Sequence, residues 1–315
     1  MIRFFDVDRV IPFMSYGKLT TTISLGTFIF AVWALWAYGL NLGVDFTGGT
    51  VMEVSYSQPA QLDQIRGSLE NAGFKEVAVQ NFGTSRDVLI RLPVSKDATA
   101  AQISNRVMDT LKAQHPDVAL KKIDFVGPQV GKELYDNGAL ALFVVAVGIM
   151  VYLAIRFEWR FAVSGMIANA HDVVIILGMF AFFQWEFTLT VLAGILAILG
   201  YSVNESVVVF DRIRENIRKM RKASIPEIID TSITQTFSRT IITHLSTQIV
   251  VLAMFFFGGE ALHNFALALT IGIMFGIYSS VLVASPLLLM FGVKREHFLR
   301  EDKPKEGVSA DGAQV

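Results

Sequence analysis

Apolar residues gather into six long runs along the chain, separated by polar or charged stretches. The runs cover residues 19–40, 138–155, 161–183, 187–210, 240–258 and 264–291. A helix needs about 20 apolar residues to cross the hydrocarbon core of a bilayer, and most of the six approach that length. The pattern predicts a polytopic α-helical membrane protein with six transmembrane helices.

Between the first two runs, residues 41–137 follow a different pattern of shorter strand-like and helix-like segments. Alternating apolar positions predict four strands, over 51–57, 76–82, 86–93 and 118–128. Two amphipathic helices are indicated by apolar residues at helical spacing: Leu62, Ile65 and Leu69 in one, Ile103, Val107 and Leu111 in the other. The order βαββαβ is typical of the ferredoxin-like motif. We therefore expect an inserted α+β domain.

The predicted organisation has five parts. They are an N-terminal segment (1–18), the first transmembrane helix (19–40), the α+β domain (41–137), transmembrane helices two to six (138–291) and a tail (292–315). Lys and Arg occur before the first run and after the second, fourth and sixth, whereas the short connections around 184–186 and 258–262 have none. Because basic loops stay on the cytoplasmic side, both termini are predicted to be cytoplasmic and residues 41–137 to lie outside.

The composition supports a membrane protein and narrows the chemistry. Of the 315 residues, 53% are hydrophobic and 17% are charged, whereas soluble domains carry about 25% charged residues. Cysteine is absent, which excludes disulfides, thiolate metal sites and a cysteine nucleophile. The net charge of −1 gives no argument for a nucleic-acid partner. Neither a cofactor nor a metal site is predicted.

Two carboxylates, Asp172 and Glu205, fall inside the apolar runs. Acids within a membrane usually face a bundle interior or water and mark ion paths or proton relays. The alternative is a hydrogen-bonded acid that fixes helix packing. Asp172 lies near the middle of the third run, beside His171. Adjacent residues on a helix point about 100° apart, so these two side chains are not expected to share one direction, and a metal site is not favoured.

A polar stripe leads into the fifth run and reaches the depth of Glu205. Its members recur every three or four residues and are Ser232, Thr236, Arg239, Thr243 and Ser246. Such a period places them on one helix face, so Arg239 and Glu205 are expected to meet. The alternative for Arg239 is anchoring at the cytoplasmic boundary. His244 and Gln248 form a second polar pair, and small residues at spacing four from Ala268 to Ala284 predict close helix packing.

Four stretches resemble the SecD/SecF family, which comprises accessory subunits of the bacterial Sec protein-translocation machinery. They are LGVDFTGGT (42–50), VGPQVGKEL (126–134), AHDVV (170–174) and GYSVNESVVVFDRIREN (200–216). The resemblance extends from Arg9 to about Phe291, with the stretches in the family's order.

The resemblance implies a half bundle like those of the resistance-nodulation-division transporters, with SecD as the partner that supplies the other half. It implies use of the proton-motive force, or of a sodium gradient, to promote late export of polypeptides across the inner membrane. Further implied partners are the SecYEG channel with its ATPase motor, a YajC-like accessory subunit and the translocating polypeptide.

The family's ion-path residues in this subunit are an aspartate in the fourth span and an arginine that opens the fifth. By position they fall on Glu205 and Arg239. Relatives usually show Asn-Asp where this chain has Asn204 and Glu205, so the carboxylate is kept with one added methylene. The predicted ion path contains Glu205, Arg239, Asp172 and Asn204.

Three other functions compete with this interpretation. An intramembrane aspartyl protease needs two cooperating aspartates, but the runs offer one Asp and one Glu without a GxGD sequence, so no enzyme is predicted. A passive scaffold subunit of the translocase is a second alternative, in which Glu205 is structural. A half of a small-molecule exporter from the same superfamily is a third, although such exporters normally carry both halves in one chain.

Overall fold

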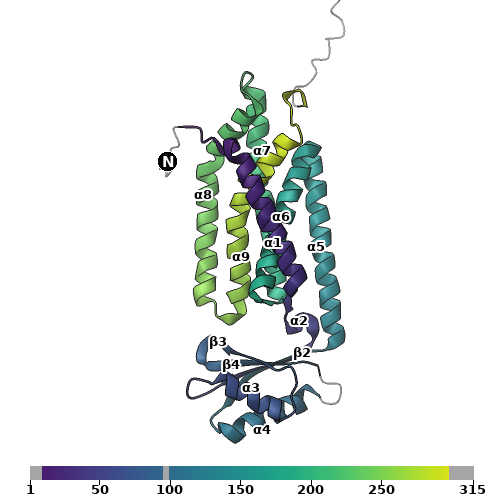
Figure 1. Ribbon diagram of the computed structural model, residues 1–315, viewed down its shortest axis with the longest axis vertical. Coiled ribbons are helices and arrows are strands. Elements are labelled where there is room, and N and C mark those ends of the chain that lie inside the picture. Colours follow the sequence, from purple (N-terminus) through teal and green to yellow (C-terminus); the bar gives the residue numbers. More distant parts are fainter. Residues whose placement is uncertain (1–8, 95–98, 298–315) are drawn as a thin grey trace, which may run out of the picture.

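The chain folds into a helical bundle with a smaller α+β domain at one end (Figure 1). The computed structural model describes residues 9–94 and 99–297. The predictions for the two terminal segments concern in part residues 1–8 and 298–315, which lie outside the described residues.

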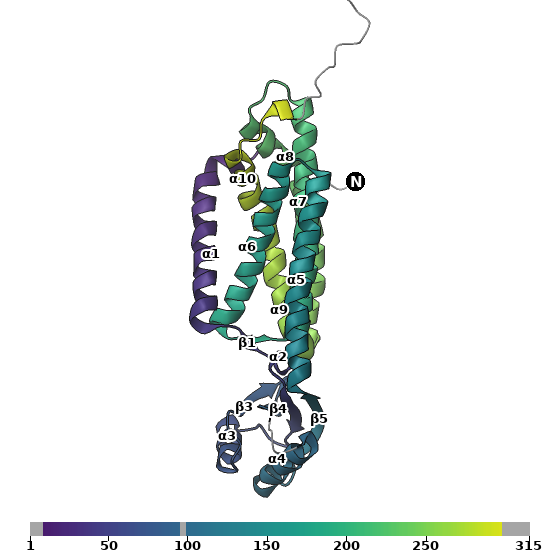
Figure 2. The ribbon, with the colours of Figure 1, turned by 90° about the vertical axis from the view of Figure 1, so that its right-hand side faces the viewer.

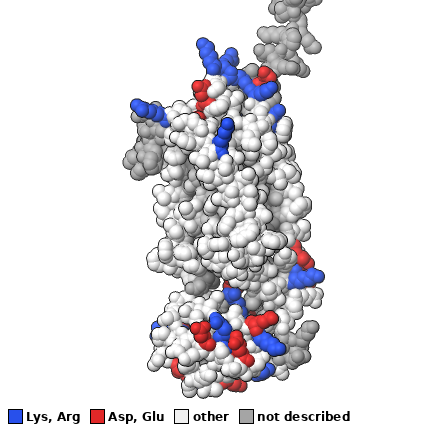
Figure 3. Space-filling view, in the orientation of Figure 1, with Lys and Arg blue, Asp and Glu red and all other residues white. Residues whose placement is uncertain are grey.

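Six long apolar helices occur in the described part of the chain, which confirms the six runs. They are α1 (Gly17–Tyr38), α5 (Pro128–Arg156), α6 (Trp159–Phe183), α7 (Leu189–Lys219), α8 (Ile225–Phe257) and α9 (Glu260–Ser279). A π-helical turn, η2 (Ser280–Ala284), continues α9 into α10 (Ser285–Met290), and together they form the sixth candidate span. Short 3-10 turns, η1 (Phe13–Tyr16) and η3 (Arg295–His297), flank the bundle. Figure 3 shows charged side chains gathered toward the two ends, with a broad uncharged band between them.

The helices α7 and α8 extend beyond the apolar runs into the basic connection between them. A capping box begins α8, since Ser224 Oγ accepts a hydrogen bond from the Glu227 amide and the Glu227 carboxylate accepts one from the Ser224 amide. One apolar cluster joins the two extensions and includes Ile213, Ile217, Ile228 and Ile229. These scattered isoleucines pack against one another and therefore extend α7 and α8 beyond the ends of the predicted apolar runs.

The α+β domain has the predicted order of elements. These are β2 (Gly49–Ser55), α3 (Leu62–Asn71), β3 (Ala78–Phe82), β4 (Thr84–Leu92), α4 (Ala100–Gln114) and β5 (Ala119–Val126). The strands form an antiparallel sheet in the order β3-β4-β2-β5. This order, with the first strand between the third and fourth, is the ferredoxin-like arrangement and confirms the prediction.

One face of this sheet forms the core of the domain. The buried side chains of this core come from the strands and from both helices. The strands contribute Met52, Val54, Val88 and Ile90, and the helices contribute Ile65, Leu69, Val107 and Leu111. Figures 1 and 2 show that α3 and α4 lie on the side of the sheet away from the bundle. The other face of the sheet therefore looks toward the bundle.

A short junction ties the domain to the bundle. The strand β1 (Asn41–Leu42) pairs in parallel with β6 (Glu186–Phe187), which lies in the connection between α6 and α7. Arg91 of β4 forms an ion pair with Glu186, and both side chains are largely buried. Burial raises the pKa of Glu186, while the charge of Arg91 opposes that shift. A loop of the bundle is thus held directly by the sheet.

A single-turn helix, α2 (Val44–Thr47), completes the junction. Its Asp45 Oδ2 accepts a hydrogen bond from the Leu189 amide at 2.9 Å and so caps the start of α7. The turn packs closely on α5, because a Cβ placed on Gly131 would lie 2.9 Å from both the Phe46 carbonyl oxygen and the Gly48 nitrogen. The amino-terminal end of α7 is therefore fixed by residues that lead directly into the α+β domain.

Candidate functional site

The helix α7 places Glu205 inside the bundle, with only 6% of the residue exposed. Thr240 of α8 donates its hydroxyl to Glu205 Oε1. His244, one turn further along α8, brings Nε2 to 3.5 Å from Glu205 Oε2. The buried carboxylate thus accepts a hydrogen bond from one hydroxyl and has one imidazole nitrogen 3.5 Å away, both from the neighbouring helix.

The buried polar face of α8 consists of Ser232, Thr236, Thr240 and His244, each four residues after the last. The predicted stripe shares the first two residues but then followed Arg239, Thr243 and Ser246, which are exposed. That part of the prediction is wrong. Spacings of three and of four residues both keep side chains near one face of a helix. The packing of α8 on α7 and α9 buries the side that carries Thr240, and not the side that carries Arg239.

The expected contact between Arg239 and Glu205 is absent from the described structure. Arg239 is exposed and forms no ion pair with Glu205 within the described ranges. It precedes Thr240 by one position, so it points about 100° away from the buried face. Asn204 is likewise exposed, one position before Glu205. The structure therefore brings neither Asn204 nor Arg239 to the carboxylate.

Asp172 lies in a second buried cluster and is 1% exposed. Its Oδ2 accepts hydrogen bonds from Ser202 Oγ of α7 at 2.8 Å and from Ser279 Oγ of α9 at 2.6 Å. His171 Nδ1 lies 3.3 Å from Asp172 Oδ1, contrary to the expected divergence of the two side chains. The 100° separation applies to their Cβ directions, whereas the imidazole is long enough to turn back toward its neighbour.

The two carboxylates lie in neighbouring buried clusters of the bundle, and we call these two clusters the polar path. Ser202, which binds Asp172, precedes Glu205 by a single turn of α7. Gly276 of α9 lies between them, and a Cβ there would make only ordinary contacts, 3.9 Å from Ser202 Cβ and 4.0 Å from His244 Cε1. The predicted small-residue ladder does pack α9 closely on α7 one turn earlier, because a Cβ on Gly272 would lie 2.6 Å from the Ile198 side chain.

Several polar atoms along this path have no hydrogen-bond partner within the described residues. They are His171 Nε2, both ring nitrogens of His244, Ser206 Oγ and Asn169 Oδ1. Each unpartnered buried group costs about 1–3 kcal/mol, and most buried polar groups in proteins are satisfied. Unpartnered buried groups in these two clusters therefore call for an explanation.

Sequence reasoning missed Ser202, Ser279 and Thr240. The available signals were the spacing of three between Ser202 and Glu205 and the spacing of four from Ser232 to His244. Ser279 offered no such signal, because only the packing of α9 on α6 shows that it reaches Asp172.

Comparison with known proteins identifies the relatives of this chain. Residues 106–294 match the family "Protein export membrane protein SecD/SecF, C-terminal", and residues 33–60 match the "SecD/SecF GG Motif". The chain belongs to the SecD/SecF family. Within it, the chain is 43% identical to "Protein translocase subunit SecF" of Vibrio alginolyticus over 312 residues, which covers 99% of both chains. It is also 43% identical over 301 residues to the same subunit of Escherichia coli O157:H7, covering 95% and 93%.

A solved SecD/SecF structure shares the fold. The crystal structure of SecDF from Thermus thermophilus matches with a TM-score of 0.81 and 36% identity. The match covers 91% of this chain but only 39% of that one. This SecF-type chain is therefore a subunit of the Sec translocase, a multi-pass protein of the bacterial inner membrane from a non-enzymatic family.

The GG motif of the family occupies the turn from α2 into β2. Gly48 and Gly49 have φ values of +71° and +138°, a region that side chains other than glycine rarely adopt. A Cβ on Gly49 would also lie 2.5 Å from the Leu92 carbonyl oxygen. Glycine is thus required where the chain passes from the bundle into the sheet.

Proposed function

We propose that this SecF-type subunit takes part in ion-driven polypeptide export and that Glu205 is its ion carrier. The observation that supports this role is a buried intramembrane carboxylate held by only Thr240 and His244 among the described residues. An ionised carboxylate in a membrane interior needs polar and charged partners, whereas the protonated acid needs far fewer. Protonation therefore changes which arrangement of α7 and α8 is the more stable.

The helix α7 is the proposed mechanical link to the α+β domain. It runs unbroken from Leu189 to Glu205, about 24 Å at 1.5 Å per residue. Its first turn is capped by Asp45, and the preceding strand β6 is held by Arg91. A shift of α7 would thus move the base of the domain, which we propose contacts the translocating polypeptide.

SecD is the proposed partner for the outward faces of α7 and α8. Asn204 and Arg239 are exposed although they lie in membrane-spanning helices, and polar or charged groups facing lipid are costly. The matched SecDF chain is longer than this one, with room for a second half. In this proposal Asn204 and Arg239 belong to the part of the ion path that borders SecD. Asp172 belongs to the part of the ion path that lies inside the bundle of this chain. The proposal also includes the SecYEG channel with its motor as an indirect partner and a YajC-like subunit as an accessory partner.

The proposed orientation puts the α+β domain outside and both termini in the cytoplasm. Basic connections at the end of the bundle opposite the domain support it. A reporter fused after Lys75 should be external, and fusions after Lys219 or at Val315 should be cytoplasmic. An external signal from the Lys219 fusion would overturn the orientation.

The ion-carrier role can be tested with Glu205→Gln, which keeps shape and hydrogen bonding but removes titration. Export is measured in inverted membrane vesicles with and without an uncoupler, and co-purification of SecD is checked. We expect the variant to bind SecD but to lose gradient-dependent stimulation. The control, Asp211→Asn, makes the same chemical change on α7 at a partly exposed carboxylate paired with Arg156, and should keep stimulation. A passive scaffold predicts full stimulation with Glu205→Gln, and that result would refute the proposal.

A further inference from the structure

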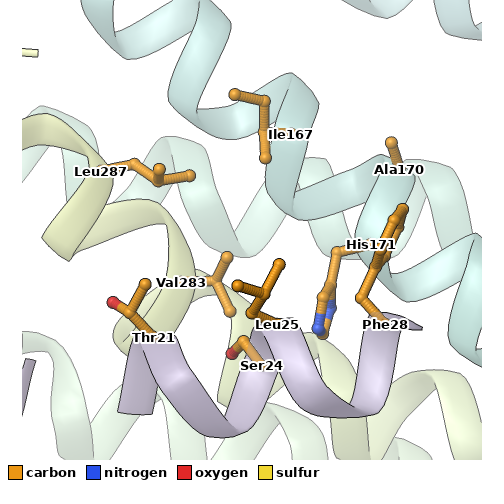
Figure 4. Close-up of a pocket in the computed structure, with 9 residues that line it drawn as sticks. All are labelled: Thr21, Ser24, Leu25, Phe28, Ile167, Ala170, His171, Val283 and Leu287. Atoms are coloured by element: carbon orange, nitrogen blue, oxygen red, sulfur yellow. The ribbon is translucent and has the colours of Figure 1, made fainter. Parts of the chain in front are cut away.

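An apolar cavity of about 410 Å³ lies between α1, α6 and the segment from η2 to α10 (Figure 4). It lies within the 300–1,000 Å³ typical of small-molecule sites. One wall is a single face of α1, made by residues at spacings of three and four: Thr21, Ser24, Leu25 and Phe28. The opposite walls come from Ile167, Ala170 and His171 of α6, Val283 of η2 and Leu287 of α10.

The cavity contains one buried polar group without a partner. His171 is 4% exposed, and its Nε2 atom forms no hydrogen bond with any described residue. Phe28 stacks on the imidazole, with ring centroids 6.2 Å apart and planes 14° apart. Figure 4 shows the two rings side by side at one end of the cavity. Because Nδ1 faces Asp172, Nε2 is the ring nitrogen left for a ligand.

We propose that this cavity binds an uncharged, bilayer-soluble alcohol or phenol whose hydroxyl group hydrogen-bonds to His171 Nε2. A hydroxyl group both donates and accepts, so it satisfies Nε2 in either tautomer of the ring. None of the nine lining residues is an acid, a lysine or an arginine, so a charged ligand would lack a counter-ion. The ligand body packs among Leu25, Ile167 and Leu287.

Access from the bilayer follows from the position of α1. Leu25 lines the cavity and is also 58% exposed on the outer surface of the bundle, so a molecule dissolved in lipid reaches the cavity past this side chain. The far wall belongs to the π-helical turn η2, a type of turn that is frequent at functional sites. The residue before that turn, Ser279, binds Asp172. A bound ligand therefore contacts His171, which faces this carboxylate, and the π-helical turn that directly follows Ser279, independently of whether Glu205 carries ions.

The test uses the full chain in lipid nanodiscs with two photoreactive probes. One is a long-chain alcohol with an aliphatic diazirine, and the other is the matching alkane without the hydroxyl group. Labelled peptides are located by mass spectrometry. We expect the alcohol to label α1 and α6 around the cavity about tenfold more than the alkane does, which corresponds to one hydrogen bond of about 1.4 kcal/mol. Unlabelled long-chain alcohol and unlabelled alkylphenol, added separately as competitors, distinguish a lipid-like from an aromatic ligand.

Two variants and a control make the result specific. His171→Phe keeps a stacked ring but removes Nε2, so labelling by the alcohol should fall to the level of the alkane. Leu25→Trp fills the cavity from its exposed side and should reduce labelling by both probes, even if His171→Phe fails to fold. The control Ile249→Trp makes a similar change on the exposed face of α8 and should leave labelling unchanged. Equal labelling by the two probes, or labelling insensitive to Leu25→Trp, would overturn the proposal.

Discussion

The two intramembrane carboxylates are held in opposite ways. Asp172 contacts donors from three helices in the described structure: Ser202 of α7, Ser279 of α9 and its own neighbour His171 on α6. Among the described residues, Glu205 has polar partners only on α8: a hydroxyl and an imidazole nitrogen 3.5 Å away. A carboxylate with hydrogen-bond donors on several helices keeps its partners unless several helices move. A carboxylate with partners on one neighbouring helix can exchange them when that helix moves.

This difference assigns complementary tasks to the two acids. Asp172 joins α6, α7 and α9 through its hydrogen bonds. Glu205 lies one turn of α7 beyond Ser202, where α7 meets α8. An ion carrier needs a rigid support on one side and a movable partner on the other. In the proposed mechanism, Asp172 would be the rigid support and Glu205 the carboxylate that exchanges partners.

The largest expected effect is on stability, from Asp172→Val. Removing the carboxylate takes this acceptor from Ser202 and His171, at about 1–3 kcal/mol for each unsatisfied group, and leaves Ser279 with only its longer bond to the Gly276 carbonyl oxygen. Since whole domains are stable by only about 5–15 kcal/mol, the variant should melt far below the parent. Thermal unfolding in detergent, followed by tryptophan fluorescence, measures this. Glu205→Val leaves fewer donors without an acceptor, so its melting temperature should fall less. An equal fall in both variants would show that the two carboxylates do not differ in this way.

The next effect is on activity, from His244→Phe. The ring fills similar space but cannot bind the ionised form of Glu205, so the uncoupler-sensitive part of export should fall about tenfold. This corresponds to the loss of one charge-assisted contact of about 1.4 kcal/mol. Export from inverted vesicles is the measurement, and Ile242→Phe on the exposed side of α8 is the control. Unchanged stimulation would show that His244 is only a packing residue.

A smaller effect is expected from Arg239→Lys. Lysine keeps the positive charge but lacks the planar fork that suits carboxylates. Since Arg239 contacts no acid of this chain within the described residues, the loss should be about twofold to threefold and should require assembly with SecD. The chain alone should melt at the parent temperature. Glu205→Asp, which restores the residue usual in relatives, should remain active and serves as the comparison. A lowered melting temperature of the lysine variant alone would contradict this placement.

The smallest effect concerns Asp87, a carboxylate outside the membrane-spanning helices. Hydrogen bonds from Lys121, Ser55 and Thr84 lower the pKa of Asp87 to about 2. Because this is below the unfolded value of about 3.9, its contribution is present above pH 4 and is lost as the pH falls toward 2. Such an exposed pair contributes at most about 1 kcal/mol. The measurement is thermal melting of residues 42–137 at pH 5 and at pH 2.5, for the parent and for Asp87→Asn. The melting temperature of the variant should fall slightly less between the two pH values than that of the parent. An identical fall in both proteins would exclude this contribution.

Much of the fold could be predicted from the sequence, because it depends on periodicity and length. The alternation in 51–57 and the spacing from Ile103 to Leu111 report which side chains face a core, and the structure confirms both. The extension of α8 back to Ile225 was harder to predict. Its isoleucines are scattered among polar residues and become an apolar seam only against α7.

The candidate site was predicted in its centre but not in its partners. Glu205 was detectable because an acid in an apolar run is rare. The choice between Arg239 and Thr240 differs by one position, or about 100° of helix rotation, and depends on how α8 packs on α7. Ser279 reaches Asp172 from a helix far along the chain. No local pattern reports such a contact.

The cap of α7 by Asp45 also bears on how the protein is made. Asp45 and the Leu189 amide are 144 residues apart, so the ribosome needs roughly 7–30 s to produce the second after the first. The strands of the α+β domain all lie between these points, so its sequence is complete before this contact with α7 can form. The core of the domain runs from Met52 to Val118 and includes no residue of α7. The contact between α2 and α5 is available earlier than the cap, because α5 directly follows β5.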